Sequence, residues 1–193
     1  ILYEFHPSTR ANVRKAPKKN VTVETKEELT PAEWNEFFNM AKETSQRNEG
    51  KNIFPSKTYF ETIQKTLPFV KNAQKNELSL SFFIGEHENR PAAMNLVLFF
   101  GDTATYLFGT SATAELPSKV TTYLHWYGIK ESKKMGYKYY DLGGIDEKLW
   151  ASLTTFKRRF KGEEFGYIGN VDIIIKPVFY KIYNVIRKIK KSI

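Results

Sequence analysis

The sequence predicts an α+β fold, in which a central, mostly antiparallel sheet is flanked by helices. Three apolar and β-branched runs between residues 78 and 108 are separated by short polar turns, as in an antiparallel meander. Segments on either side of the meander carry apolar residues at helical spacing. With 193 residues, 41% of them hydrophobic, the chain is long enough for one substantial core.

The most clearly marked helix lies before the meander, over residues 31–47. Thr30 to Glu33 form a capping box with a proline at the first helical position, and apolar side chains follow at helical spacing from Trp34 to Ala41. The other elements expected in this half are a helix over 8–16 that Pro17 ends, a strand over 21–24, and a helix over 56–67 capped by Ser56.

The second half of the chain predicts alternation between sheet and helix. Gly136 is placed to end one helix, and Gly143–Gly144 marks a turn after the following strand. The expected elements are strands over 78–85, 92–100 and 103–108, a helix over 117–135, a strand over 137–142, a helix over 147–160, a β segment over 164–174 and a basic helix after Pro177.

This order of elements indicates a specific architecture. A meander whose last strand leads through one helix into a parallel strand is the layout of the GNAT fold, the acyl-CoA N-acyltransferase fold. In that fold the parallel pair splays apart, and the acyl donor lies in the split. We therefore expect one GNAT-like domain over 1–175, with residues 176–193 as a basic amphipathic helix packed on it or extending from it.

Composition excludes several kinds of site. The chain has no cysteine, so it has no disulfide, thiolate nucleophile or zinc-thiolate site. Its histidines, His6, His87 and His125, are far apart and form no metal-binding motif, so we predict no metal site. No stretch approaches the ~20 apolar residues that cross a bilayer.

The net charge of +9 is concentrated at the two ends of the chain. Residues 1–20 carry five basic side chains and one acidic one, and residues 176–193 carry six basic side chains and no acidic one. Such clusters attract nucleic-acid phosphates or acidic lipid headgroups, and solvated basic faces are the alternative. The last helix is amphipathic, which suits either peripheral contact with an anionic membrane or packing on the domain.

The connection after the meander argues against a coenzyme A donor. GNAT domains that use acetyl-CoA place a glycine-rich loop with an arginine there, and its backbone amides cradle the pyrophosphate at the start of the next helix. Residues 108–117 contain one glycine, one acidic residue and no arginine. We expect no cofactor, and an acyl donor other than acetyl-CoA.

Several segments resemble the Fem family of peptidoglycan-bridge aminoacyltransferases, FemAB and its relatives. They are YxxGxS within TYLFGTSA (105–112), YYDxGG within LPSKVTTYLHWYGIKESKKMGYKYYDLGGI (116–145), FKxxFxGE within TTFKRRFKGE (154–163), the opening STRANVRKAPKKNV (8–21) and the terminal KPVFYKIYNVIRKIKK (176–191). The likeness runs from end to end of the chain, and the combination of patterns is more specific than any one of them.

The resemblance implies a transferase that moves an amino acid from aminoacyl-tRNA onto the amine of a lipid-linked peptidoglycan precursor, a step of cell-wall bridge formation. It implies a cytoplasmic protein at the inner face of the plasma membrane. Family members generally have two GNAT-like lobes, and this chain corresponds to the second alone. Because the chain starts at Ile1 rather than Met, we expect a piece of a longer protein that holds the first lobe.

The resemblance marks Lys157, the lysine of the FK motif, as the catalytic residue. Aminolysis of an ester develops negative charge on the carbonyl oxygen, and a cation there stabilises it. The alternative for Lys157 is a solvated helix end. Phe156 and Phe160 lie one helical turn apart and are expected to face the core beside it, with Phe156 also a substrate contact. Tyr106 matches a family tyrosine that lines the acceptor groove, and core packing is its alternative.

Other predicted substrate contacts come from separate parts of the chain. Tyr59 matches the family's helical tyrosine for the same substrate, but Pro55 stands where the family has the partner arginine. Ser111 closes the YxxGxS pattern. Asp141 is a candidate for orienting an amine, with a turn cap as the alternative.

Arg10 and Arg14, one helical turn apart, are candidates for contacts with tRNA or diphosphate oxygens. Two other functions stay open on the sequence. One is a GNAT-like N-acyltransferase acting on another envelope amine, and the other is a non-catalytic lobe that binds tRNA or membrane through its cationic ends. The sequence does not specify the amino acid, the acceptor or the oligomeric state.

Overall fold

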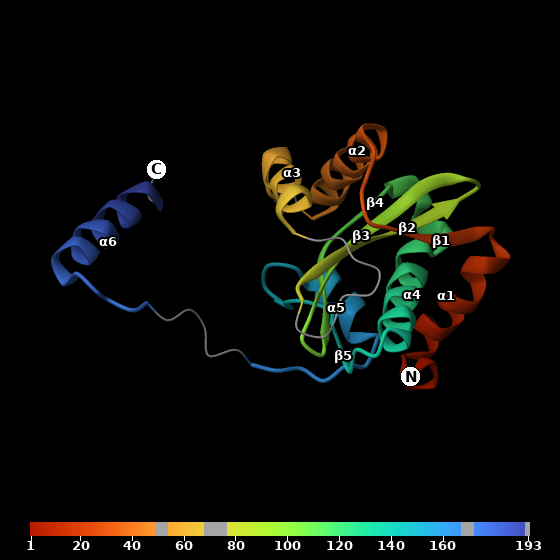
Figure 1. Cartoon of the computed structure of the whole chain (residues 1–193). Coiled ribbons are helices and arrows are strands. Elements are labelled where there is room, and N and C mark those ends of the chain that lie inside the picture. Colours follow the sequence, from red (N-terminus) through yellow and green to blue (C-terminus); the bar gives the residue numbers. More distant parts are fainter. Residues whose placement is uncertain (49–53, 68–76, 167–171, 192–193) are drawn as a thin grey trace. The chain divides into compact units, whose positions relative to one another are not determined.

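A five-stranded sheet with the order β1-β2-β3-β4-β5 forms the centre of the fold (Figure 1). Its strands are β1 (Val21–Lys26), β2 (Ser79–His87), β3 (Arg90–Phe100), β4 (Thr103–Ser111) and β5 (Tyr139–Asp141). Strands β1 to β4 pair antiparallel, and β5 pairs parallel with β4. The predicted meander and parallel pair are both present, and the α+β class is confirmed.

The computed structural model describes residues 1–48, 54–67, 77–166 and 172–191. The chain divides into two compact units, Ile1–Gly162 and Glu163–Ile193. The first unit contains the sheet and η1 (Leu2–Glu4), α1 (Pro7–Lys18), α2 (Pro31–Arg47), α3 (Lys57–Thr66), η2 (Thr113–Ser118), α4 (Val120–Lys134) and α5 (Ala151–Arg158), and the second contains α6 (Pro177–Lys191). Within the described ranges, no helix has both the length and the apolar character needed to span a bilayer.

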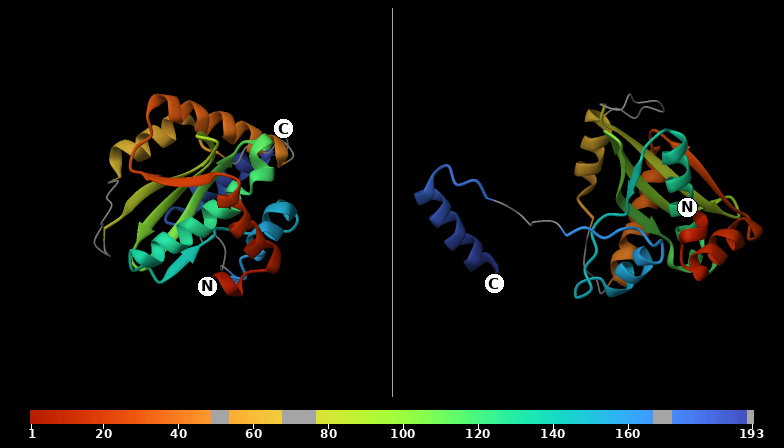
Figure 2. Two further views of the ribbon diagram at one scale, coloured as in Figure 1. Left: turned by 90° about the vertical axis from the view of Figure 1, so that its right-hand side faces the viewer. Right: turned by 90° about the horizontal axis from the view of Figure 1, so that it is seen from below.

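The two faces of the sheet are covered by different helices (Figure 2). Helices α2 and α3 pack on one face, where Phe37 of α2 meets Phe82 of β2. Helices α1 and α4 pack on the other face, in the cluster that contains Phe83 and Leu124. Neighbouring residues of β2 belong to different clusters because successive side chains of a strand point to opposite faces.

Helix α2 begins where the sequence predicts. The Glu33 N–H donates to Thr30 Oγ1 at 3.3 Å and the Thr30 N–H donates to the Glu33 carboxylate at 2.8 Å, which completes the capping box. Trp34, one residue further on, is buried, and its Nε1 donates to Gln64 of α3 at 3.0 Å. The cap therefore sets where α2 begins, and its buried aromatic face holds the helix on the sheet.

Several predicted boundaries are wrong, because packing makes some elements longer and others start later in the chain than predicted. Helix α1 continues through Pro17 to Lys18, since the buried Ala16 holds its last turn in the core. Strand β4 continues to Ser111, because its backbone still pairs with β3 there, opposite Ala93. The helix predicted over 117–135 begins at Val120 after η2, and the helix predicted over 147–160 begins at Ala151.

The β segment predicted over 164–174 is wrong within its described residues. Residues 164–166 and 172–174 have no regular structure, and the sheet contains no strand from them. Residues 167–171 lie outside the described ranges. Apolar and β-branched composition alone does not make a strand without a neighbouring strand to receive its backbone hydrogen bonds.

Candidate active site

The split that the fold predicts lies where β4 and β5 part. The two strands pair only from Thr103–Tyr139 to Thr105–Asp141. Beyond Asp141 the chain turns at Gly143, whose φ of +74° lies in the region that favours glycine. The Gly143 N–H donates to Asp141 Oδ1 at 2.7 Å, so Asp141 does form the turn cap that the sequence offered as one alternative.

Lys157 of α5 extends into this opening. Its Nζ donates to the Gly144 carbonyl at 2.8 Å and lies 5.7 Å from the centre of the Tyr106 ring. Only 7% of Lys157 is exposed, so the solvated helix end is ruled out for this side chain. Burial lowers the pKa of Lys157 to about 8, and the Asp141 carboxylate opposes that effect. A buried ammonium with a lowered pKa in a split is a candidate catalytic group.

Aromatic contacts hold α5 against α4. Phe156 and Phe160 pack on each other with ring centroids 5.4 Å apart, and on His125 of α4 at 5.4 and 5.6 Å. Phe5, from the N-terminal segment, packs on Phe160 at 5.2 Å. Phe156 and Phe160 therefore face the core as predicted, and Lys157 lies beside Phe156 on α5.

No sequence pattern marks His125, which is nevertheless part of this group. Its ring, 4% exposed, meets Tyr106 edge-on with centroids 4.6 Å apart. Its Nδ1 is buried without a hydrogen-bond partner among the described residues. Burial, and secondly the charge of Lys157, lower the pKa of His125 to about 3, so the ring is neutral at physiological pH. Only the packing of α4 on β4 reveals this position.

The YxxG part of the YxxGxS pattern has a steric reason. The pairing of β3 with β4 shifts between Leu96 and Val97, which makes Leu107 an extra residue in β4. The bulge brings Tyr106 and Gly109 to the same side of the strand, where a Cβ on Gly109 would lie 2.1 Å from the Tyr106 hydroxyl. Only glycine leaves room for the tyrosine ring. Burial raises the pKa of Tyr106, so its hydroxyl stays protonated.

The serine of the same pattern is bonded to α2. Arg47 Nη2 donates to Ser111 Oγ at 2.7 Å and to the Ser111 carbonyl at 3.0 Å. The Ser111 N–H donates to Thr44 Oγ1 at 3.1 Å, and the residue is 5% exposed. These bonds anchor the end of β4. A direct contact of Ser111 with substrate stays a prediction.

Three other predicted residues lie elsewhere. Tyr59 is 47% exposed on α3, which covers the face of the sheet opposite to α4 (Figure 2). Arg10 donates to the Tyr3 carbonyl at 2.6 Å, and Arg14 is exposed on α1. The structure therefore brings together four of the predicted site residues: Lys157, Phe156, Tyr106 and Asp141.

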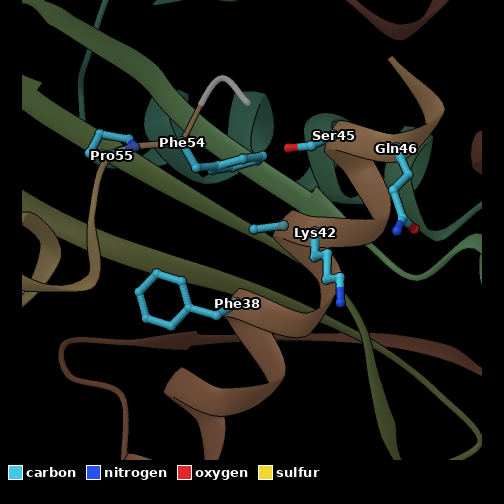
Figure 3. Close-up of a pocket in the computed structure, with 7 residues that line it drawn as sticks. Phe38, Lys42, Ser45, Gln46, Phe54 and Pro55 are labelled. Atoms are coloured by element: carbon cyan, nitrogen blue, oxygen red, sulfur yellow. The ribbon is translucent and has the colours of Figure 1, made fainter. Parts of the chain in front are cut away.

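A cavity of about 350 Å³ lies between α2 and the segment just before α3 (Figure 3). Pro55, which stands where the family has an arginine, forms part of its wall. The described residues that line it include one basic side chain, Lys42, and are Phe38, Ala41, Lys42, Ser45, Gln46, Phe54 and Pro55. None of the residues gathered around Lys157 is among them.

Solved structures with a similar fold come from several kinds of protein. The crystal structure of FemX matches with 16% identity and a TM-score of 0.67, covering 82% of this chain and 54% of that chain. An aminoglycoside acetyltransferase, meta-AAC0020, from an uncultured soil metagenomic sample matches with 14% identity and a TM-score of 0.51, covering 81% and 97%. A transcriptional regulator from Bacillus halodurans C-125 matches with 14% identity and a TM-score of 0.52, covering 79% and 99%.

At such identities the structural likeness shows the GNAT fold alone. The chain spans about half the length of the FemX chain that it matches. No curated protein matches the sequence significantly. The sequence model of the FemAB family does match, over residues 69–188, which is more than half of the chain and includes the Tyr106, Gly109 and Lys157 positions. The chain therefore belongs to the FemAB family.

Proposed function

We propose that this chain is an aminoacyltransferase lobe, which transfers an amino acid from aminoacyl-tRNA to the amine of a lipid-linked peptidoglycan precursor. The observation that carries the proposal is the buried Lys157 ammonium, held between Gly144 and the Tyr106 ring where β4 and β5 part. Membership of the FemAB family supports the class of reaction. The tRNA donor and the precursor acceptor are part of the proposal.

The reaction is aminolysis of an ester. The acceptor amine forms a bond to the aminoacyl carbonyl carbon, the bond from that carbon to the ribose oxygen breaks, and a proton passes from the amine to the ribose oxygen. Negative charge develops first on the carbonyl oxygen and then on the leaving oxygen. An ammonium that is already buried needs little solvent reorganisation to stabilise that charge, because burial has removed most of its water.

Lys157 can supply more than one of these interactions. One N–H bond is used on the Gly144 carbonyl, which orients the group. The other two, which have no hydrogen-bond partner in the part of the chain that the structure describes, can donate to the carbonyl oxygen of the ester and then to the leaving oxygen. With a pKa of about 8, Lys157 is mainly protonated at neutral pH and close enough to neutrality to exchange a proton. The Tyr106 ring lies beside the ammonium, and Phe156 packs on His125, which in turn contacts Tyr106; both rings are proposed to line the substrates.

The pH dependence of transfer should follow Lys157. If the ammonium is required, activity falls as the pH rises through about 8. The Asp141 carboxylate raises that pKa, so Asp141→Asn should move the alkaline fall to lower pH, while its amide oxygen can still accept from the Gly143 N–H. Asp102→Asn, in the β3–β4 turn, is the matched control and should leave the profile unchanged. A wild-type profile that stays flat through the pKa of Lys157, or an Asp141→Asn profile shifted upward, contradicts the role.

The function is tested by offering the full chain two donors. Labelled aminoacyl-tRNA and labelled acetyl-CoA are each incubated with a lipid-linked peptidoglycan precursor, and the product is identified by mass spectrometry. Transfer from aminoacyl-tRNA alone is the expected result. Acetyl transfer alone would favour a GNAT-like N-acyltransferase of another envelope amine. Binding of tRNA that weakens steeply with salt, without any transfer, would favour a non-catalytic lobe.

A further inference from the structure

Three consecutive backbone N–H groups, beginning with that of the last residue of β4, are all hydrogen-bonded within the chain. The Ser111 N–H donates to Thr44 Oγ1 at 3.1 Å. The Ala112 N–H donates to the Ala92 carbonyl at 3.0 Å. The Thr113 N–H donates to the Glu43 carboxylate at 2.6 Å. Two of the three acceptors come from α2, a helix more than sixty residues earlier in the chain.

The acceptor on Thr113 is a fixed anion. The pKa of Glu43 is lowered, first by the Thr113 N–H and then by further bonding to Thr113 and the charge of Arg47. Glu43 therefore remains ionised at neutral pH. Arg47, one turn further along α2, donates to Ser111 and to Thr113 Oγ1, so it bonds the same connection as Glu43.

This connection is where a GNAT domain that uses an acyl-CoA would place the pyrophosphate. Binding a pyrophosphate there depends on free backbone N–H groups that point at the anion. In this chain the N–H groups of Ser111, Ala112 and Thr113 are occupied, and the approaching anion would meet the Glu43 carboxylate. The pyrophosphate and the Glu43 carboxylate would repel each other, because both are negatively charged. The three N–H groups, already bonded within the chain, would offer no hydrogen bond to offset that repulsion.

We propose that Glu43 is a specificity-determining residue, which occupies the Thr113 N–H just after β4 as an internal anion and so excludes acyl-CoA donors from the split. Arg47 and Thr44 support it by fixing Ser111. This assignment rests on the proposed function, which takes aminoacyl-tRNA as the donor. Glu43 is then the residue that prevents binding of acyl-CoA, the donor that other GNAT domains use.

The test measures binding of pyrophosphate and of coenzyme A to the full chain by thermal shift and by isothermal titration calorimetry. Wild type should show no saturable stabilisation at millimolar ligand. Glu43→Ala frees the Thr113 N–H and removes the carboxylate, while Arg47 remains. Pyrophosphate should therefore bind to this variant at least about tenfold more tightly than to wild type. Glu36→Ala is the matched control, because it removes an exposed carboxylate two turns earlier on α2 and should gain nothing.

Glu43→Gln guards against a loss of structure in the alanine variant. It keeps an acceptor for Thr113 and removes only the charge, so it should gain less than Glu43→Ala but more than Glu36→Ala. Saturable binding of coenzyme A to wild type would overturn the proposal, as would two folded Glu43 variants that gain no anion binding. A failure of aminoacyl transfer would instead overturn the proposed function and leave this measurement intact, since binding of pyrophosphate needs no transfer.

Discussion

Lys157→Ala should lower the rate of aminoacyl transfer by about 10²–10³-fold, the usual cost of removing one donor that stabilises a developing oxyanion. The loss should appear mainly in kcat, because the charge that Lys157 stabilises forms only in the transition state. The measurement is single-turnover transfer from purified aminoacyl-tRNA to the precursor amine. Lys148→Ala removes an exposed positive charge from the loop before α5 and is expected to leave the rate unchanged.

Stability separates a catalytic Lys157 from a structural one. Its pKa lies below the value of an unfolded lysine, so burying the ammonium costs stability at neutral pH, and the cost disappears above the unfolded pKa. Lys157→Met keeps the length of the side chain without the charge, and it should match or exceed wild type in melting temperature while losing activity. A methionine variant that unfolds, or one that keeps full turnover, would refute the assignment.

Gly109→Ala should damage both the fold and the site. The new methyl would lie 2.1 Å from the Tyr106 hydroxyl and 2.7 Å from Asn95 Oδ1, far inside contact distance. Overpacking of this kind costs about 1–3 kcal/mol of unfolding free energy. For a domain of this size the melting temperature should fall by roughly 2–12 °C. Transfer should slow as well, because Tyr106 must leave its place between Gly109 and the Lys157 ammonium.

A double-mutant cycle identifies the cause of that loss. Tyr106→Ala removes the nearer of the two clashing groups, so the cost of Gly109→Ala should be markedly smaller in the Tyr106→Ala background. Gly162→Ala, at a position where a Cβ meets nothing within 4 Å, controls for the general effect of replacing glycine. Purely additive stabilities in the cycle would show that Tyr106 and Gly109 do not compete for the same space.

Sequence patterns predicted those parts of the site that lie close together along the chain. Phe156, Lys157 and Phe160 share one helix, so their spacing alone indicated that the phenylalanines face inward beside the lysine. The split followed from the order of strands and helices. The absence of an arginine and of a glycine-rich run after β4 also predicted that a pyrophosphate cradle is missing, and this stays a prediction.

Contacts between distant segments could not be predicted in this way. His125 meets Tyr106 only because α4 packs on the same side of β4, and nothing in its sequence neighbourhood distinguishes it from a core histidine. The β segment predicted over 164–174 failed for the related reason that a strand requires a partner, which composition does not provide. Peripheral membrane contact through the last helix, and tRNA contact through Arg10 and Arg14, stay predictions.

The amino-acid sequence by itself determined the α+β class, the GNAT-like order of elements, the family and the choice of Lys157, since all of these depend on local periodicity and on patterns within short segments. The tertiary structure alone decided the state of that lysine. Its burial between Gly144 and Tyr106 lowers its pKa to about 8, and the packing of α2 against the end of β4 places the Glu43 carboxylate on the Thr113 N–H. Both depend on desolvation and on hydrogen bonds between segments far apart in the chain, which no local pattern encodes.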